Sequence, residues 1–346
     1  MSDHALLYES GARASKWSRT GVILGAAATA LAAAVVYNSV ATRRTERRHP
    51  PSGRFVEIDG IRLHYLERGT GTPVVLIHGN VVTAEDWVLS GVFDQIVARG
   101  HRVIAFDRPG YGYSDRPRDV AWSAGAQAEL MRRALVELGI ERGAVVVGHS
   151  WGTLPAVALA LSGSGAVRGL VLVSGYYNPT VRADALLVTP AAVPLLGDVL
   201  HHTASPLFGA ASLPSLVKGM FAPLPVPDRF QRGFDRGMPV RPLQIRAEAE
   251  DGAGMAREAA AMRDRYRELR VPVMIIAGSD DQVVDVGRQA AQLREQISNS
   301  QLKLVPGAGH MVHYAAPRQV VEAVEAVMSK HQAARSASSL VTQEAS

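Results

Sequence analysis

The residues Gly148-His149-Ser150-Trp151-Gly152 fit the pattern G-x-S-x-G, in which a serine is presented on a sharp turn between a strand and a helix. Apolar segments at 144–147 and 153–162 flank the pattern and predict that strand and that helix. The turn exposes the hydroxyl above the sheet, where the free N–H groups and the dipole of the helix can stabilise an oxyanion. We therefore predict that Ser150 is the nucleophile of an acyl-transfer reaction.

A serine hydroxyl reacts only when a base takes its proton, so a histidine held by a carboxylate is expected elsewhere in the chain. His310 follows the predicted strand 301–305, and Asp280 and Asp281 follow the apolar predicted strand 271–277. Both places belong to the edge at which ligands bind in open parallel sheets. We predict His310 as the general base and Asp281 as the acid that orients it, although spacing alone does not separate the two aspartates. Asp280 is expected to cap the helix that follows.

The other histidines and one cluster of carboxylates are assigned no part in the reaction. His78 and His149 are expected to hydrogen-bond the loops behind the site, and His313 to cap or pack. His201 and His202 are expected to be solvated. The cluster of carboxylates is predicted to lie on an exposed helix face; its members are Glu248, Glu250 and Asp251.

Short apolar segments alternate with longer amphipathic ones, which predicts an α/β fold with a largely parallel sheet covered on both faces. The predicted core comprises residues 53–176 and 270–330. Expected strands are 54–58, 61–66, 73–77, 102–106, 144–147, 168–174, 271–277 and 301–305, and expected helices are 83–98, 123–138, 153–162, 283–297 and 315–328.

The alternation stops between residues 177 and 269, a segment rich in proline and in apolar pairs such as Leu207-Phe208. We predict there an inserted lid of short helices joined by irregular segments. Residues 331–346 are rich in Ser and Ala and are predicted to be a disordered tail.

The N-terminal region contains an apolar stretch of about the length that crosses a bilayer as a helix. After a tail at residues 1–20, residues 21–42 are predicted to be a single membrane anchor, followed by a linker at 43–52. The alternative is a signal peptide cleaved near Ala41. The four arginines at 43, 44, 47 and 48 oppose translocation and favour the anchor.

Charge and composition exclude several classes of protein. The net charge of +5 comes almost entirely from the first fifty residues, so the body is close to neutral and no nucleic-acid surface is expected. The absence of cysteine excludes disulfides, a thiolate nucleophile and sulfur-ligated zinc. The predicted chemistry requires no metal and no organic cofactor.

Over residues 53–330 these motifs resemble the α/β-hydrolase superfamily. His78-Gly79-Asn80 is similar to the oxyanion loop of the family, and the run from Asp107 to Ser114 is similar to its D-x-P-G-x-G-x-S turn. The segment 278–281 resembles the family's acid motif, and the segment 309–311 resembles its histidine motif. The resemblance implies an eight-stranded sheet, a lid after the sixth strand, and an oxyanion hole made by the backbone N–H groups of Asn80 and Trp151.

One departure from the family bears on the chemistry. Asn80 and Trp151 look like the halide-stabilising pair of the dehalogenase branch, but that branch uses an aspartate nucleophile, and here the residue is Ser150. Dehalogenation is therefore not expected.

The expected reaction is hydrolysis of an ester or related acyl bond in a hydrophobic small molecule, through an acyl-enzyme on Ser150. A proline aminopeptidase, a carbon–carbon bond hydrolase and a cofactor-free perhydrolase share the fold and stay open as alternatives. A non-catalytic receptor is the alternative from another class, and it would not need Ser150, Asp281 and His310 together.

Overall fold

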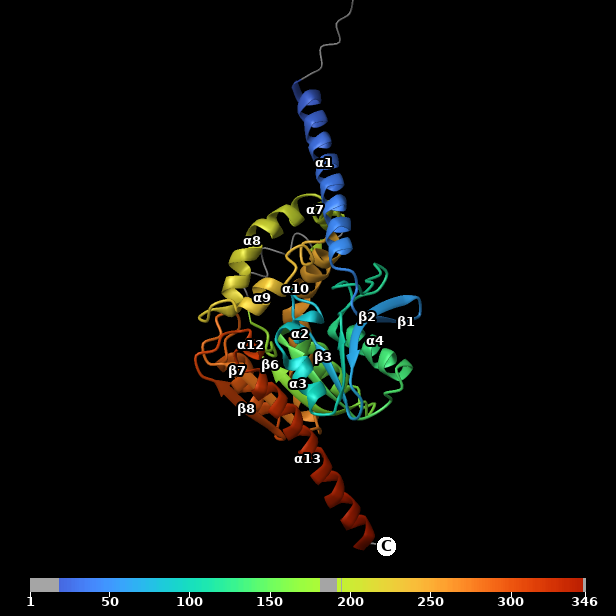
Figure 1. Ribbon diagram of the computed structural model, residues 1–346, viewed down its shortest axis with the longest axis vertical. Coiled ribbons are helices and arrows are strands. Elements are labelled where there is room, and N and C mark those ends of the chain that lie inside the picture. Colours follow the sequence, from blue (N-terminus) through green and yellow to red (C-terminus); the bar gives the residue numbers. More distant parts are fainter. Residues whose placement is uncertain (1–18, 181–191, 194, 345–346) are drawn as a thin grey trace, which may run out of the picture.

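The computed structural model describes residues 19–180, 192–193 and 195–344, and its centre is an eight-stranded sheet in the order β1-β2-β4-β3-β5-β6-β7-β8 (Figure 1). β2 pairs antiparallel with β1 and with β4, and all other neighbours pair in parallel. The predicted fold class is therefore confirmed. The strands are β1 (Arg54–Ile58), β2 (Ile61–Arg68), β3 (Pro73–Ile77), β4 (Arg102–Phe106), β5 (Ala144–His149), β6 (Val167–Val173), β7 (Val273–Gly278) and β8 (Ser300–Val305).

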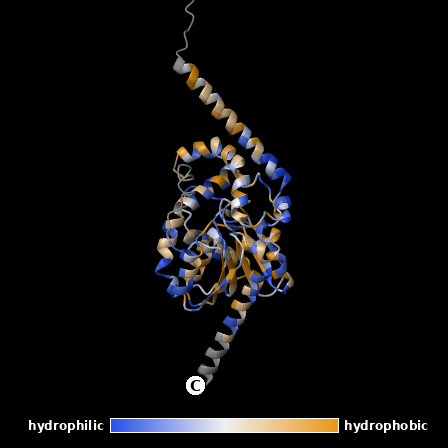
Figure 2. Cartoon of the chain, turned by 90° about the vertical axis from the view of Figure 1, so that its left-hand side faces the viewer, coloured by the Kyte–Doolittle hydropathy of each residue, from blue (hydrophilic) through white to orange (hydrophobic). Residues whose placement is uncertain are grey.

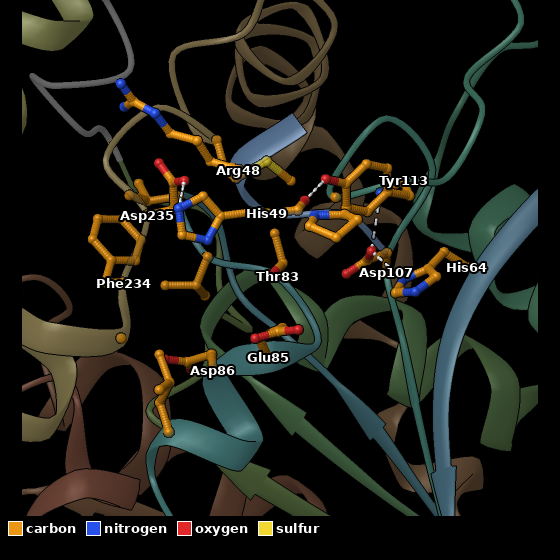
Figure 3. A pocket seen from close by; sticks show the side chains of 17 residues that line it. Arg48, His49, His64, Thr83, Glu85, Asp86, Asp107, Tyr113, Phe234 and Asp235 are labelled. Carbon is orange, nitrogen blue, oxygen red and sulfur yellow. Dashed lines mark hydrogen bonds and ion pairs between the residues drawn. The ribbon is translucent and has the colours of Figure 1, made fainter. Parts of the chain in front are cut away.

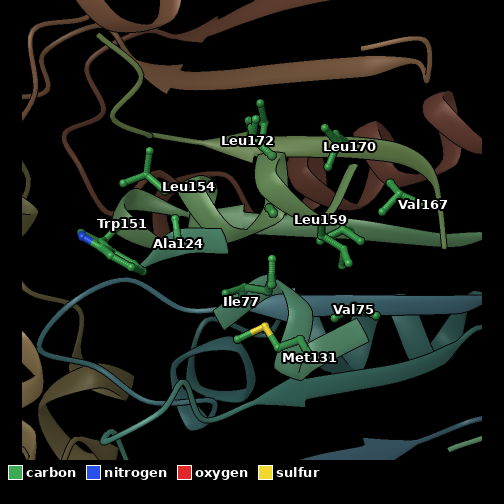
Figure 4. Packing of buried hydrophobic residues seen from close by; sticks show 14 of the residues in the cluster. Val75, Ile77, Ala124, Met131, Trp151, Leu154, Leu159, Val167, Leu170 and Leu172 are labelled. Atoms are coloured by element: carbon green, nitrogen blue, oxygen red, sulfur yellow. The ribbon is translucent and has the colours of Figure 1, made fainter. Parts of the chain in front are cut away.

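The two faces of the sheet have separate hydrophobic cores because successive side chains of a strand point to opposite sides. On β3, Val75 and Ile77 join the core under α4 (Ala124–Glu137) and α5 (Thr153–Leu161), which Figure 4 shows. Val74 and Leu76 join the other core, under α3 (Val92–Ala98) and α13 (Pro317–Glu344). Because β4, β3, β5, β6, β7 and β8 pair in parallel, their carboxyl ends lie at one edge of the sheet.

Two predicted helices are shorter than expected. The helix expected at 83–98 is divided into α2 (Glu85–Leu89) and α3, because Gly91 lies between them with a left-handed φ of 78°. The helix expected at 283–297 consists of a π-helical turn, η3 (Gly287–Ala291), followed by α11 (Gln292–Gln296).

Among the described residues, four α-helices and the short 3-10 helix η2 (Tyr266–Glu268) lie between β6 and β7, where the lid was expected; residues 181–191 and 194 of that segment lie outside the described residues. The four α-helices are α7 (Leu196–His202), α8 (Ala204–Phe221), α9 (Asp228–Gly233) and α10 (Pro242–Arg263). Leu213, Met220, Phe221 and Phe230 pack against Val81 and Val82 of the loop after β3 and against Met311 and Tyr314 near the last helix. His201 is buried, contrary to expectation, and His202 is exposed.

The two ends of the described chain are more helical than predicted. α1 (Arg19–Arg48) continues through residues 43–48, which we expected to begin a linker. α13 continues to Glu344 through residues that we expected to be disordered. The apolar part of α1 projects from the body, and its basic end lies against the body (Figure 2). By length and hydropathy α1 is the one described helix that could cross a membrane, a property that a signal sequence shares.

Candidate active site

Ser150 lies at the turn that joins β5 to α5 through the short helix η1 (Ser150–Gly152). Its φ of 51° is left-handed, a strained conformation for a residue with a side chain. The strand and helix approach closely here: a Cβ at Gly148 would lie 2.6 Å from the Gly152 carbonyl oxygen, and one at Gly152 would collide with the His78 carbonyl oxygen. Glycine at both positions allows the tight turn that presents the Ser150 hydroxyl.

The structure brings Ser150, His310 and Asp281 together from three parts of the chain. His310 Nε2 lies 2.9 Å from Ser150 Oγ, and His310 Nδ1 lies 2.8 Å from Asp281 Oδ2. The Asp281 side chain has no exposed surface, and the His310 side chain is 4% exposed. In this arrangement Nδ1 donates to the carboxylate, which leaves Nε2 free to accept the serine proton.

The two neighbouring aspartates have different contacts, which separates them where spacing did not. Asp281 Oδ1 accepts the backbone N–H groups of Val283 and Val284 at 2.8 and 3.0 Å. Asp280 Oδ1 instead lies 2.9 Å from the hydroxyl of Ser279. The expectation that Asp280 caps the following turn is wrong: Asp281 caps it with one oxygen and holds His310 with the other.

Two buried histidines, His78 and His149, support the loops around these residues. His78 lies between the Gly79 carbonyl oxygen and the Arg108 N–H, and burial lowers its pKa to about 4, so it is neutral. His149 Nε2 faces the His310 carbonyl oxygen at 3.3 Å, and burial holds the pKa of His149 well below its usual range. Both keep the supporting role that we expected.

His313 fixes the segment after His310 to helix α2. Its Nε2 lies 2.8 Å from Asp86 Oδ2, and Tyr314 donates its hydroxyl to Asp86 Oδ1 at 2.7 Å. Asp86, His149 and His313 also offer atoms within 4.8 Å of one another, a spacing that would suit a metal ion. Because the Asp86 carboxylate is already held by two protein donors, we interpret the group as structural support for the loop.

A buried network of charges connects the lid helix α10 to the loop that carries Asn80. Asp251 accepts hydrogen bonds from Arg108 Nη1 at 2.6 Å and Arg116 Nη2 at 2.9 Å. The side chains of Arg108 and Asp251 have no exposed surface. Arg108 Nη2 donates to Asn80 Oδ1 at 2.6 Å. The prediction that Asp251 lies on an exposed helix face is wrong, because its carboxylate is the counter-ion of two buried arginines.

The side chains of Asn80 and Trp151 are both used by this network. Asn80 Oδ1 also accepts the Tyr111 hydroxyl at 2.9 Å, and the Trp151 indole N–H donates to the Asp251 carbonyl oxygen at 3.0 Å. The Arg108 guanidinium lies 4.1 Å from the Tyr111 ring centroid and 4.3 Å from that of Trp151. The Trp151 indole N–H therefore has a protein acceptor, whereas the dehalogenase branch uses this donor to bind a halide. The backbone N–H groups of Asn80 and Trp151 remain the predicted oxyanion donors.

Glu248 of α10 holds the residue after Asn80. Its Oε1 accepts the Val81 backbone N–H at 3.2 Å and the Gln244 amide N–H at 3.1 Å. Val81 has a left-handed φ of 73°, so this contact supports a strained position. Burial raises the pKa of Glu248 to about 7. Glu248 is only partly buried, but its carboxylate is held by protein N–H groups, which differs from the solvated helix face that we expected. Glu250, with a side chain 36% exposed, pairs with Arg116.

Glu248→Gln is expected to change how stability depends on pH. The folded protein keeps the Glu248 proton up to about pH 7, whereas the unfolded chain releases it near the ordinary value of 4.5. The group's contribution to stability is thus fully present below pH 4.5 and is lost as the pH rises to 7, by up to about 3 kcal/mol. The melting temperature of the variant should rise relative to the parent between pH 5 and pH 8.

Melting curves of the detergent-solubilised chain at both pH values would measure this effect. Glu295→Gln, at an exposed position of α11, is the matched control. A difference between parent and Glu248→Gln that does not vary with pH would contradict the prediction.

A cavity of about 290 Å³ lies beside the oxyanion loop (Figure 3). Val81, Val82 and Thr83 line it together with His49 and Pro50 of the segment after α1, Asp107 and Tyr113 of the turn after β4, and Phe234 and Asp235 of the lid. Ser150 and His310 are not among its lining residues. The cavity therefore adjoins the loop that carries Asn80 and does not contain the nucleophile.

Comparison with known proteins places these features in a family. A family model described as alpha/beta hydrolase fold matches residues 72–317. The non-heme chloroperoxidase of Streptomyces lividans is 31% identical over 275 residues, which cover 75% of this chain and 92% of that protein. The 2-hydroxy-6-oxo-2,4-heptadienoate hydrolase of Pseudomonas putida is 27% identical over 275 residues, with coverages of 79% and 94%.

A solved esterase from Exiguobacterium antarcticum has the same fold, with a TM-score of 0.60 at 22% identity over 81% of this chain and 99% of that one. Proteins similar to this chain are thus named for different reactions. The reaction has to be inferred from the site, because the fold alone does not determine it.

Proposed function

The chain belongs to the alpha/beta hydrolase fold family, and we propose that it is a serine hydrolase that cleaves an ester or related acyl bond of a hydrophobic small molecule. The observation that carries the proposal is the 2.9 Å contact between His310 Nε2 and Ser150 Oγ. A histidine in this position can accept the serine proton as the oxygen attacks a carbonyl carbon.

The proposed reaction has two steps that use the same residues. Ser150 Oγ bonds to the acyl carbon, its proton passes to His310 Nε2, and the carbonyl electron pair moves to the oxygen, which the N–H groups of Asn80 and Trp151 stabilise. The intermediate expels the alcohol, which takes the proton from His310. Water then attacks the acyl-enzyme with His310 as base, releases the acid and restores Ser150. Asp281 keeps the imidazole in the tautomer that both steps need.

Relatives favour two alternatives, a carbon–carbon bond hydrolase and a cofactor-free haloperoxidase or perhydrolase, which would use the same three residues. A proline aminopeptidase is less well supported. It would need lid carboxylates free to bind an amine, and Asp251 is neutralised by two arginines while Glu248 accepts protein N–H groups. A receptor without catalysis would not need the contacts among Ser150, His310 and Asp281.

Labelling with a fluorophosphonate probe tests the nucleophile. We expect the parent chain to label and Ser150→Ala not to label, because the probe reacts only with an activated hydroxyl. Ser162→Ala, at the other end of α5, is the control and should label like the parent. Equal labelling of the parent and Ser150→Ala would refute the assignment. Esters of increasing chain length would then define the acyl group.

We also propose that α1 anchors the chain in a membrane, and that the alternative of a cleaved signal peptide does not apply. The four arginines that follow the apolar stretch support this, because they oppose translocation. Carbonate extraction of membranes that contain the full chain should leave it in the pellet at full length. Release into the soluble fraction, or a product shortened by about forty residues as cleavage near Ala41 would give, would count against the anchor.

A further inference from the structure

The lid presents apolar side chains to solvent beside the helix that is proposed to enter the membrane. On α7, Leu196 is 50% exposed and Val199 is 52% exposed, and on α8, Leu207 is 47% and Phe208 is 72% exposed. Residues 199–217 contain no Asp, Glu, Lys or Arg. In residues 195–209 the one charged side chain, Asp198, pairs with Arg118. This surface has the character of one that contacts an apolar phase.

α1 is joined to the lid at the junction of these two helices. Asn38, which is 3% exposed, donates hydrogen bonds of 2.9 Å to the carbonyl oxygens of His202 and Thr203. Further toward the body, Glu46 pairs with Arg241 at 2.9 Å and His49 with Asp235 at 2.6 Å. The position of the lid along α1 is therefore set by contacts at several points, and Figure 1 shows α7 and α8 on the side from which α1 leaves the body.

The length of α1 sets the depth of that junction in a bilayer. The apolar stretch 22–41 is about 30 Å long as a helix, which matches the thickness of the hydrocarbon core. Residue 41 then marks the boundary on the side of the body, and Asn38 lies roughly 4.5 Å inside it. Val199 and Leu207 are each about one helical turn from the residues that hold Asn38, and the arginines at 43, 44, 47 and 48 fall at the level of the phosphates.

We propose that the exposed apolar residues of α7 and α8, hereafter the lid ridge (Leu196, Val199, Leu207 and Phe208), insert into the membrane leaflet next to α1. The lid ridge would lie at the boundary between headgroups and acyl chains, where surface-bound amphipathic helices lie. The substrate class that follows is a membrane-resident acyl ester, whose carbonyl sits at that same boundary and reaches the lid without crossing water. This last step rests on the proposed hydrolase function, whereas the insertion does not.

Site-specific fluorescence tests the insertion directly. The chain contains no cysteine, so a single introduced cysteine can carry an environment-sensitive NBD label. Phe208→Cys and Val199→Cys probe the lid ridge, and Leu304→Cys, an apolar position of β8 that is 47% exposed, is the control. The full-length chain would be reconstituted in phosphatidylcholine vesicles with a minor fraction of phosphatidylglycerol, at low protein density.

We expect labels at 208 and 199 to shift to the blue and to lose fluorescence when the lipids carry a nitroxide on the acyl chain, and the label at 304 to do neither. Emission at 208 and 199 like that at 304 would overturn the proposal. A blue shift without quenching by lipid nitroxides would also overturn it, because it would show that a second copy or another part of this chain covers the lid ridge.

Hydrolysis tests the substrate class separately. The double variant Leu207→Ser, Phe208→Ser should hydrolyse a long-chain ester held in vesicles about tenfold more slowly than the parent, since it loses apolar contact with the leaflet. Its hydrolysis of a water-soluble short-chain ester should not change. Equal losses on both esters would overturn a role for the lid ridge in access. A parent that cleaves neither ester would refute the proposed function, and the fluorescence result would still decide the insertion.

Discussion

Replacing Asp281 by Asn is expected to lower kcat for hydrolysis of a soluble ester by about 10⁴-fold while the protein stays folded. The reason lies in the two backbone N–H groups, of Val283 and Val284, that Asp281 Oδ1 accepts. In the variant these groups hold the amide oxygen, so the amide NH₂ faces His310 Nδ1. Nδ1 must then accept, the proton moves to Nε2, and the imidazole can no longer take the proton of Ser150.

Asp280→Asn is the matched control for this variant. Asp280 is exposed and bonds the neighbouring Ser279, so its substitution should leave kcat unchanged. Steady-state kinetics at neutral pH, with a melting curve to show that both variants are folded, would make the comparison. If Asp280→Asn lost activity and Asp281→Asn kept it, the acid would be the other aspartate.

The sequence was sufficient to predict that Ser150, Asp281 and His310 converge, because each follows a strand of the predicted parallel sheet. Parallel strands of that kind end at one edge, so position after the strand implies position in space. Their catalytic role, and that of the Asn80 and Trp151 amides, stays a prediction. Spacing did not separate Asp280 from Asp281, and the resemblance of residues 278–281 to the acid motif of the family favoured Asp281. Their different hydrogen bonds have no counterpart in the spacing and are seen in the structure alone.

The buried charges of α10 could not be predicted from local pattern. Glu248 and Asp251 have the spacing of a solvated helix face, and the arginines that neutralise Asp251 lie more than a hundred residues earlier, at 108 and 116. One signal was available: Arg108 lies two residues after a buried strand and precedes Pro109, a place where a charged side chain needs a partner. The identity of that partner depends on how the lid packs on the core, which periodicity does not determine.

The lengths of α1 and α13 were underestimated from the sequence for a common reason. Residues 43–48 were assigned to a linker because they are charged, and residues 331–344 to a disordered tail because they are small and polar. Arg, Glu, Gln and Ala are nevertheless good helix formers, and α1 gains the contact of Glu46 with Arg241. Composition alone therefore led us to underestimate the helical backbone of both segments.

Asp251→Ala is expected to destabilise the protein by about 3–5 kcal/mol, because it leaves Arg108 buried without a counter-ion and leaves Arg116 with Glu250 as its remaining carboxylate partner. Both arginine side chains are at most 1% exposed, so water cannot replace the carboxylate. The melting temperature should fall by on the order of 10 °C. Asp264→Ala, at the exposed end of the same helix, is the control and should change stability by less than about 0.5 kcal/mol.

The same variant should also lose activity at temperatures where it is still folded. Arg108 holds Asn80 Oδ1 at 2.6 Å and is itself positioned by Asp251, so the loss of the carboxylate releases the loop that carries a predicted oxyanion donor. Removing one oxyanion donor lowers kcat by about 10²–10³-fold, and this factor is the upper limit for the loss expected from a donor that is only less well positioned. A folded Asp251→Ala protein with normal kcat would show that the network holds the lid on the core without positioning the oxyanion loop.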